Sequence, residues 1–112
     1  MEKTITLLVQ LQTVIKLFHW SSKSYSEHIA LGELYDSLSE SIDTLVESVQ
    51  GETGILDIKI PQVSKEGLNP ITTITNVCKQ LETVKEEDWI TNQIQEILKD
   101  LYKTKYKLIN LK

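Results

Sequence analysis

The chain has 112 residues, of which 40% are hydrophobic and 25% are charged, and its formal net charge is −4. This size suits a single domain with one core and is short for a two-domain enzyme. The acidic balance argues against a protein that coats nucleic acid, because phosphate contacts need a surplus of Lys and Arg.

Residues 3–20 have the pattern of an amphipathic helix, with apolar side chains three and four residues apart. Gln10, Gln12 and Lys16 interrupt the apolar stretch TITLLVQLQTVIKLF, which is too short to span a bilayer and has no small-residue cleavage site. We therefore expect neither a signal peptide nor a membrane segment. The apolar stripe of this helix is Leu8, Leu11, Ile15 and Phe18.

A second helix is predicted from Ser24 to Gly51. Ser24 and Glu27 fit a capping box, in which the serine hydroxyl accepts from a free backbone amide and the glutamate reaches back. Gly51 is a natural C-terminal stop. The apolar stripe between them is Leu31, Leu34, Tyr35, Leu38, Ile42, Leu45, Val46 and Val49.

The next stretch, ETGILDIKIPQVSKEGLNP, contains two glycines and two prolines, which exclude one continuous helix. Its ILDIKI part alternates apolar and polar residues, so we expect it to run extended over the surface. Asn69 and Pro70 then give an N-cap and a first helical residue. Two further helices follow, from there to Lys85 and from Trp89 to Leu108. Their stripes are Ile71, Ile74, Val77, Cys78, Leu81 and Val84, then Ile90, Ile94, Ile97, Leu98 and Leu101.

Cys78 is the single cysteine, so an intrachain disulfide is excluded. Its place in an apolar stripe indicates a core residue rather than a nucleophile. Because nothing in the cysteine usage suggests an oxidising compartment, we expect a cytoplasmic protein.

The four helices are joined by short turns between the first and second and between the third and fourth, with one long link in the middle. A long link lets the third helix run parallel to the second, as in bundles with a single crossover. The sequence therefore predicts an all-α, ferritin-like four-helix bundle that forms one domain over residues 1–112.

His19 and His28 are the only histidines, and they flank the turn between the first two helices. Asp43 and Glu47 are four residues apart on the second helix, so their carboxylates lie one turn apart and can hold one metal ion. Fifteen residues of helix, or about 22 Å, separate His28 from Asp43. One metal ion could contact all four side chains only if a second copy packed its helix antiparallel across a two-fold axis.

A simpler interpretation is also open. Glu33, Asp36, Glu40, Asp43 and Glu47 recur at spacings of three and four, which is also typical of a solvated acidic face. His19 could be a packed residue at a helix end, hydrogen bonded to a backbone carbonyl. The spacing alone favours this interpretation over a metal site.

Residues 19–51 resemble a segment of the Dps-type mini-ferritins. The shared elements are His19-Trp20, then His28, the Leu34-Tyr35-Asp36 triplet, and the Asp43 and Glu47 pair. The segment HWSSKSYSEHIALGELYD, with the later acid pair and glycine, is even more similar to a family of small ferritin-like proteins often encoded by bacteriophages, and the ending YKLINLK is similar to the last helix of that family.

The resemblance implies an intersubunit ferroxidase-type site with His19, His28, Asp43 and Glu47 as ligands. It implies iron as the metal and a protein that oxidises or sequesters iron(II). The mix of imidazole and carboxylate ligands also suits manganese or zinc. A different class stays open, in which a bacteriophage structural or assembly protein keeps the dimer without turnover. The Glu-x-x-His pairs of larger ferritins are missing, so no internal two-iron site is expected.

We expect the partner to be a second copy, in a homodimer or a larger homo-oligomer, and we expect no membrane. Nucleic acid is not expected as a partner, because the acidic chain has no basic tail to neutralise phosphates. If the protein is encoded by a phage, its place is the host cytoplasm or the virion.

Overall fold

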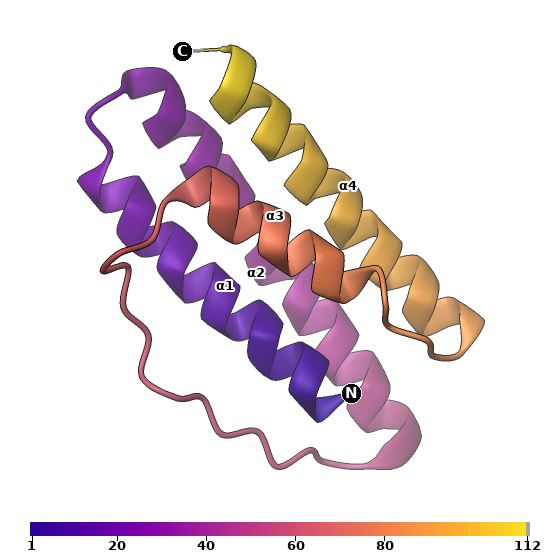
Figure 1. Cartoon of the computed structure of the whole chain (residues 1–112). Helices are drawn as coiled ribbons and strands as arrows, with labels where there is room; N and C mark the ends of the chain where they lie inside the picture. The colour runs from indigo at the N-terminus through magenta and orange to yellow at the C-terminus, as the bar shows by residue number, and fades with distance from the viewer. Residues whose placement is uncertain (112) are drawn as a thin grey trace.

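The computed structural model describes residues 1–111 and contains four helices: α1 (Glu2–Ser21), α2 (Tyr25–Thr53), α3 (Pro70–Leu81) and α4 (Asp88–Asn110). In the chain trace of Figure 1, α1 and α4 run in one direction and α2 and α3 in the other. Helix α1 packs beside α2 and α3, and α4 packs beside the same two helices. The parallel pair α2 and α3 therefore lies on a diagonal of the bundle, and the long link travels back along its length.

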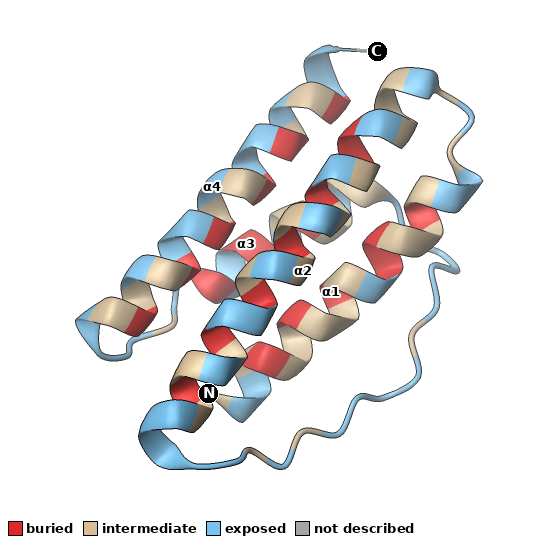
Figure 2. Ribbon diagram, turned by 180° about the vertical axis from the view of Figure 1, so that it is seen from behind, coloured by how far each residue is buried: buried red, intermediate tan, exposed pale blue. Residues whose placement is uncertain are grey.

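The predicted stripes point inward and form one core, which Figure 2 shows as buried residues on the facing sides of the helices. Tyr35 and Val46 of α2 are half-buried at its edge, as are Ile71, Val84 and Leu98. All other residues of the four stripes are buried. The prediction of an all-α four-helix domain is confirmed, and the ferritin-like part of the prediction stays a prediction.

The structure corrects two helix ends. Helix α2 does not stop at Gly51 but continues to Thr53, and Gly54 ends it with a φ of 96° while its N–H donates to the Gln50 carbonyl. This positive φ is easily adopted by glycine, which explains why the chain turns there. Buried Val49 holds the last turn of α2 against the core.

Helix α3 ends at Leu81, four residues before the predicted end at Lys85. The Thr83 and Val84 amides donate to the Gln80 and Leu81 carbonyls, three residues back, and the Thr83 hydroxyl also donates to Gln80. Such bonds tighten the backbone and end an α-helix. The remaining bounds differ from prediction by two residues or fewer, which is within ordinary fraying.

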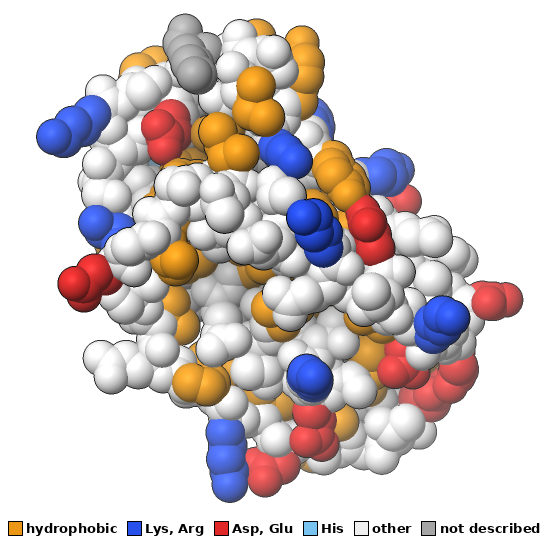
Figure 3. Space-filling model, in the orientation of Figure 1, with side chains coloured by type: hydrophobic (Ala, Val, Ile, Leu, Met, Phe, Trp, Pro, Cys, Tyr) orange, Lys and Arg blue, Asp and Glu red, His pale blue; other side chains and the backbone are white. Residues whose placement is uncertain are grey.

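The link, residues 54–69, runs outside α1 without regular secondary structure (Figure 1). Leu56, Ile58 and Val63 pack against the core, whereas Ile55 and Ile60 are exposed, so the alternating pattern anchors the link through one set of side chains. Beside the link, a hollow of about 240 Å³ lies between α1 and α3. Figure 3 shows this face of the molecule, with hydrophobic side chains around the hollow. Within residues 1–111, no helix is long and apolar enough to cross a bilayer.

Candidate functional site

The two histidines form one compact unit at the end of the bundle where α1 passes into α2. Their rings are stacked, with centroids 3.9 Å apart and an interplanar angle of 16°. His19 Nδ1 lies 2.7 Å from the His28 carbonyl oxygen, and His28 Nδ1 lies 2.9 Å from the His19 carbonyl oxygen. Each ring is therefore bonded to the backbone of the other residue.

These reciprocal bonds fix the tautomer. A carbonyl oxygen can only accept, so each Nδ1 must carry a hydrogen, and in a neutral ring Nε2 then holds the free lone pair. Within residues 1–111, neither Nε2 has a hydrogen-bond partner, and Gln93 Oε1 is the one buried side-chain N or O atom left unbonded. Both Nε2 atoms are therefore accessible to a ligand from outside the chain.

The local sequence builds this unit through a tight turn. Ser24 caps α2, since its hydroxyl accepts from the Glu27 amide at 3.4 Å, and the Ser22 hydroxyl donates to the Ser24 carbonyl at 3.1 Å. The serine half of the predicted capping box is confirmed. Because only Ser22, Lys23 and Ser24 separate the helices, the end of α1 and the start of α2 lie side by side.

Gly32 makes the approach of the two helices possible. A Cβ atom at this position would lie 2.8 Å from His19 Cε1 and 3.2 Å from His19 Nδ1. A ring with a hydrogen bond on one side and a stacked partner on the other has little freedom to retreat. Gly32 is four residues after His28 and therefore occupies the same side of α2, where it leaves room for the second ring.

Lys16 supplies the positive charge nearest to this unit along α1. Its Nζ atom lies 4.3 Å from the Tyr35 ring centroid and 5.6 Å from the Trp20 ring centroid, within the range of cation–π attraction. Trp20 itself is 67% exposed. The lysine therefore crosses from α1 to α2 and holds its charge at the outer surface of the helix pair.

Asp43 and Glu47 are one turn apart on α2, as predicted, and both are exposed. Neither forms an ion pair within the described residues. Residues 1–111 contain no group of three or more His, Cys, Asp or Glu side chains able to hold a metal ion. The structure thus brings His19 and His28 together, and it leaves Asp43 and Glu47 as a separate pair farther along the same helix.

The sequence reasoning missed Gly32 and Lys16. A glycine four residues after a histidine, inside an otherwise continuous helix, indicates close approach by another group and could have been noticed. Lys16 carried no such signal, because its role depends on which side chains of α2 lie opposite it.

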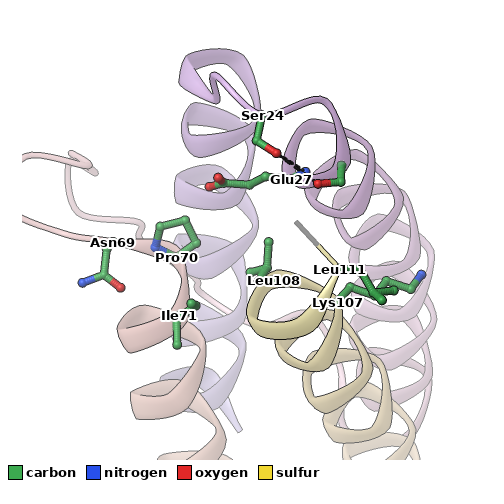
Figure 4. Close-up of a pocket in the computed structure, with 9 residues that line it drawn as sticks. Ser24, Glu27, Asn69, Pro70, Ile71, Lys107, Leu108 and Leu111 are labelled. Carbon is green, nitrogen blue, oxygen red and sulfur yellow. Dashed lines mark hydrogen bonds between the residues drawn. The ribbon is translucent and has the colours of Figure 1, made fainter.

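Two other surface features are candidates for a binding site. A pocket of about 440 Å³ lies between the starts of α2 and α3 and the end of α4 (Figure 4), and it contains none of the four predicted ligands. Acidic side chains also gather where α2 ends and α4 begins, at the lower right of Figure 3, among them Glu52 and Glu87. A hydrogen bond with Glu87 raises the pKa of Glu52.

Cys78 is buried in the core, as predicted, and burial raises the pKa of its thiol to about 11. The thiol is therefore protonated at neutral pH, and a thiolate is the form that attacks substrates. Cys78 is thus a packing residue.

No curated protein and no solved structure matches the chain. A family model described as a family of unknown function, DUF5856, matches residues 19–108. The matched region includes both histidines, the acid pair and nearly all of the bundle from the end of α1 onward. The chain therefore belongs to the DUF5856 family.

Proposed function

We propose that this protein binds a divalent transition metal, above all iron(II), at a site shared by two antiparallel copies of the chain. His19 and His28 of one copy supply imidazole nitrogens, and Asp43 and Glu47 of the other supply carboxylate oxygens. The observation that carries the proposal is the pair of reciprocal Nδ1 bonds, which leaves both Nε2 lone pairs free.

This arrangement has the chemistry of a metal-binding pair. A histidine ligand usually donates its second ring N–H to a carbonyl or carboxylate, which fixes the tautomer and the ring orientation. Both rings meet that condition within a single chain, through the backbone alone. Two imidazoles and two carboxylates suit iron(II), manganese(II) or zinc(II).

The shared site follows from distance. Helical geometry puts His28 and Asp43 about 22 Å apart on one straight helix, so one ion cannot touch both in the same chain. An antiparallel second α2 would bring its acid pair to the histidine end, and two-fold symmetry would create two equivalent sites.

In the ferritin-like interpretation, iron(II) is the substrate and gives an electron to peroxide or dioxygen. The two exposed carboxylates suit this task, because they neutralise charge on the ion as it becomes iron(III). The protein would then oxidise or sequester iron in the cytoplasm, that of the host cell if the chain is encoded by a phage.

One observation favours a second candidate. The same reciprocal bonds tie the last turn of α1 to the first turn of α2, so the histidines could serve the fold alone. The protein would then be a helical structural or assembly component, for example of a virion, that keeps the dimer without turnover.

Elemental analysis of the purified protein, followed by aerobic iron(II) oxidation, separates the candidates. We expect two metal ions per dimer and oxidation faster than in buffer, with both lost in a His19→Ala, His28→Ala variant. Stoichiometric metal without oxidation would reduce the function to metal binding. A wild-type protein that takes up no metal from excess iron(II), zinc(II) or manganese(II) would support the structural candidate.

A further inference from the structure

The outer surface of α2 has an unbalanced charge. It carries Glu33, Asp36, Glu40, Asp43 and Glu47, all exposed, and α2 contains no Lys or Arg. Glu33 is paired with Lys107 of α4 at 3.0 Å, but the other four acids have no ion pair within the described residues. If two such surfaces met, like charges would face each other unless cations lay between them.

Lys16 is the cation placed to balance this surface. Between Lys3 and Lys23, α1 has no other Lys or Arg, and Lys16 reaches across to α2 at Tyr35, the neighbour of Asp36. Its ammonium group touches two aromatic rings and has no carboxylate partner within residues 1–111. A lysine held in this way keeps hydrogen-bond donors for a group outside the chain.

The shared metal site proposed above fixes where two copies would cross, and the present inference rests on it. In an antiparallel pair of α2 helices, residue 28 of one copy lies level with the midpoint of residues 43 and 47 of the other. The two-fold axis then passes halfway between those levels, beside Asp36 and Ser37. A residue on a two-fold axis meets its own symmetry mate, so Asp36 would face Asp36.

We propose that two ion pairs hold the dimer together at its two-fold axis. In each pair, Lys16 of one chain binds Asp36 of the other. The same residues that would repel across the axis, two aspartates and two lysines, become two attractive pairs when each lysine reaches the opposite aspartate. In the single chain, aromatic contact holds each ammonium beside Tyr35, the residue before Asp36. The partner that fits this surface is therefore a second copy, selected by complementary charge.

Metal binding and dimerisation are coupled in this arrangement. Lys16 balances Asp36 at the axis, and a divalent ion balances Asp43 and Glu47 at each end of the contact. Removing the metal leaves four carboxylates beside the partner chain, so a chelator should weaken the dimer, because a ligand that binds only the dimer stabilises it by mass action.

Variants that reverse the charge of Lys16 or Asp36 test the proposed ion pairs at the two-fold axis. We would measure the dimer dissociation constant by sedimentation equilibrium for wild type, Lys16→Glu, Asp36→Lys and the double variant, each with zinc(II) and with chelator. Each single reversal should raise the constant at least about tenfold, since two attractive pairs become repulsive, and the double variant should return to within about threefold of wild type. Lys79→Glu on α3 and Asp57→Lys in the link make the same charge changes at exposed positions away from this surface and should have no effect.

Lys16→Met keeps the apolar stem against Tyr35 and serves as a second variant if Lys16→Glu loses helicity. If the single variants dimerise as well as wild type, or if the double variant still dimerises weakly, the proposed Lys16–Asp36 pairs are wrong even if wild type binds metal. If the single and double variants behave as expected but the protein binds no zinc(II), the result would support the Lys16–Asp36 pairs and contradict the metal site. A wild type that is monomeric with and without zinc(II) would contradict both.

Discussion

The two ends of α2 differ in how much of a binding site a single chain builds. At the N-terminal end, His19 and His28 are stacked, bonded to backbone and seated over a glycine. Farther along α2, Asp43 and Glu47 are exposed and form no ion pair within the described chain. One half of the proposed site is therefore preorganised, and the other depends on what docks against it.

The two pairs should also differ in their contribution to the free energy of unfolding. Removing side chains that hold helices together costs stability, whereas removing side chains that only face solvent does not. The histidine pair joins two helices and contributes to folding before any metal binds. The acid pair contributes nothing to the isolated chain and should carry a small cost, since like charges four residues apart on a helix repel.

The largest stability effect should follow removal of the histidine pair. We expect the His19→Ala, His28→Ala variant to lose about 2–3 kcal/mol of unfolding free energy without metal, because two hydrogen bonds between α1 and α2 disappear. The Asp43→Ala, Glu47→Ala variant should stay within about 0.5 kcal/mol of wild type. Urea unfolding in chelator at a fixed low protein concentration measures both. Equal losses of unfolding free energy in the two variants would contradict the difference between the histidine pair and the acid pair.

A smaller effect should come from a single methyl group. Gly32→Ala places Cβ against the His19 ring and should cost about 1–3 kcal/mol through overpacking. Gly51→Ala in the same helix meets nothing within 4 Å and should stabilise the protein by about 0.5–1 kcal/mol. Thermal unfolding of both variants compares them directly. If both alanines stabilise, the histidine stack is looser than described.

The smallest effect concerns Cys78, which lies in the core away from both half-sites. Burial raises the pKa of its thiol to about 11, so its contribution to stability is complete below the ordinary thiol pKa and is lost as pH rises toward 11. Thiol labelling at pH 8 should stay slow in wild type and in Gly32→Ala. Fast labelling in Gly32→Ala alone would mean that this variant disturbs the whole fold rather than the histidine pair.

The fold was largely predictable because each helix carries a regular apolar stripe and the long link limits the topology. Two helix ends were wrong for local reasons. The helix continues past Gly51 because the positive φ that ends it is adopted by Gly54, three residues later. After Leu81, the Thr83 hydroxyl and tighter backbone hydrogen bonds end the helix, although Val84 continues the apolar spacing in the sequence.

The candidate site was predictable only in part. The sequence placed His19 near His28 because a short turn joins their helices, and this proximity is confirmed. It gave no sign of the reciprocal bonds, since these depend on the angle at which α1 meets α2. The suggestion that His19 bonds to a backbone carbonyl is also confirmed, and that bond is compatible with a ligand at Nε2.

The shared site is tested most directly by a mixed dimer. One chain carries His19→Ala and His28→Ala, the other Asp43→Ala and Glu47→Ala, and the two are co-expressed and isolated through different tags. Each homodimer should lose tight zinc(II) binding, because every site keeps only one kind of ligand. The mixed dimer gathers all the changes at one site and restores the other, so it should hold about half the zinc(II) of wild type. A mixed dimer that binds no zinc(II), beside a wild type that does, would contradict a site shared between two chains.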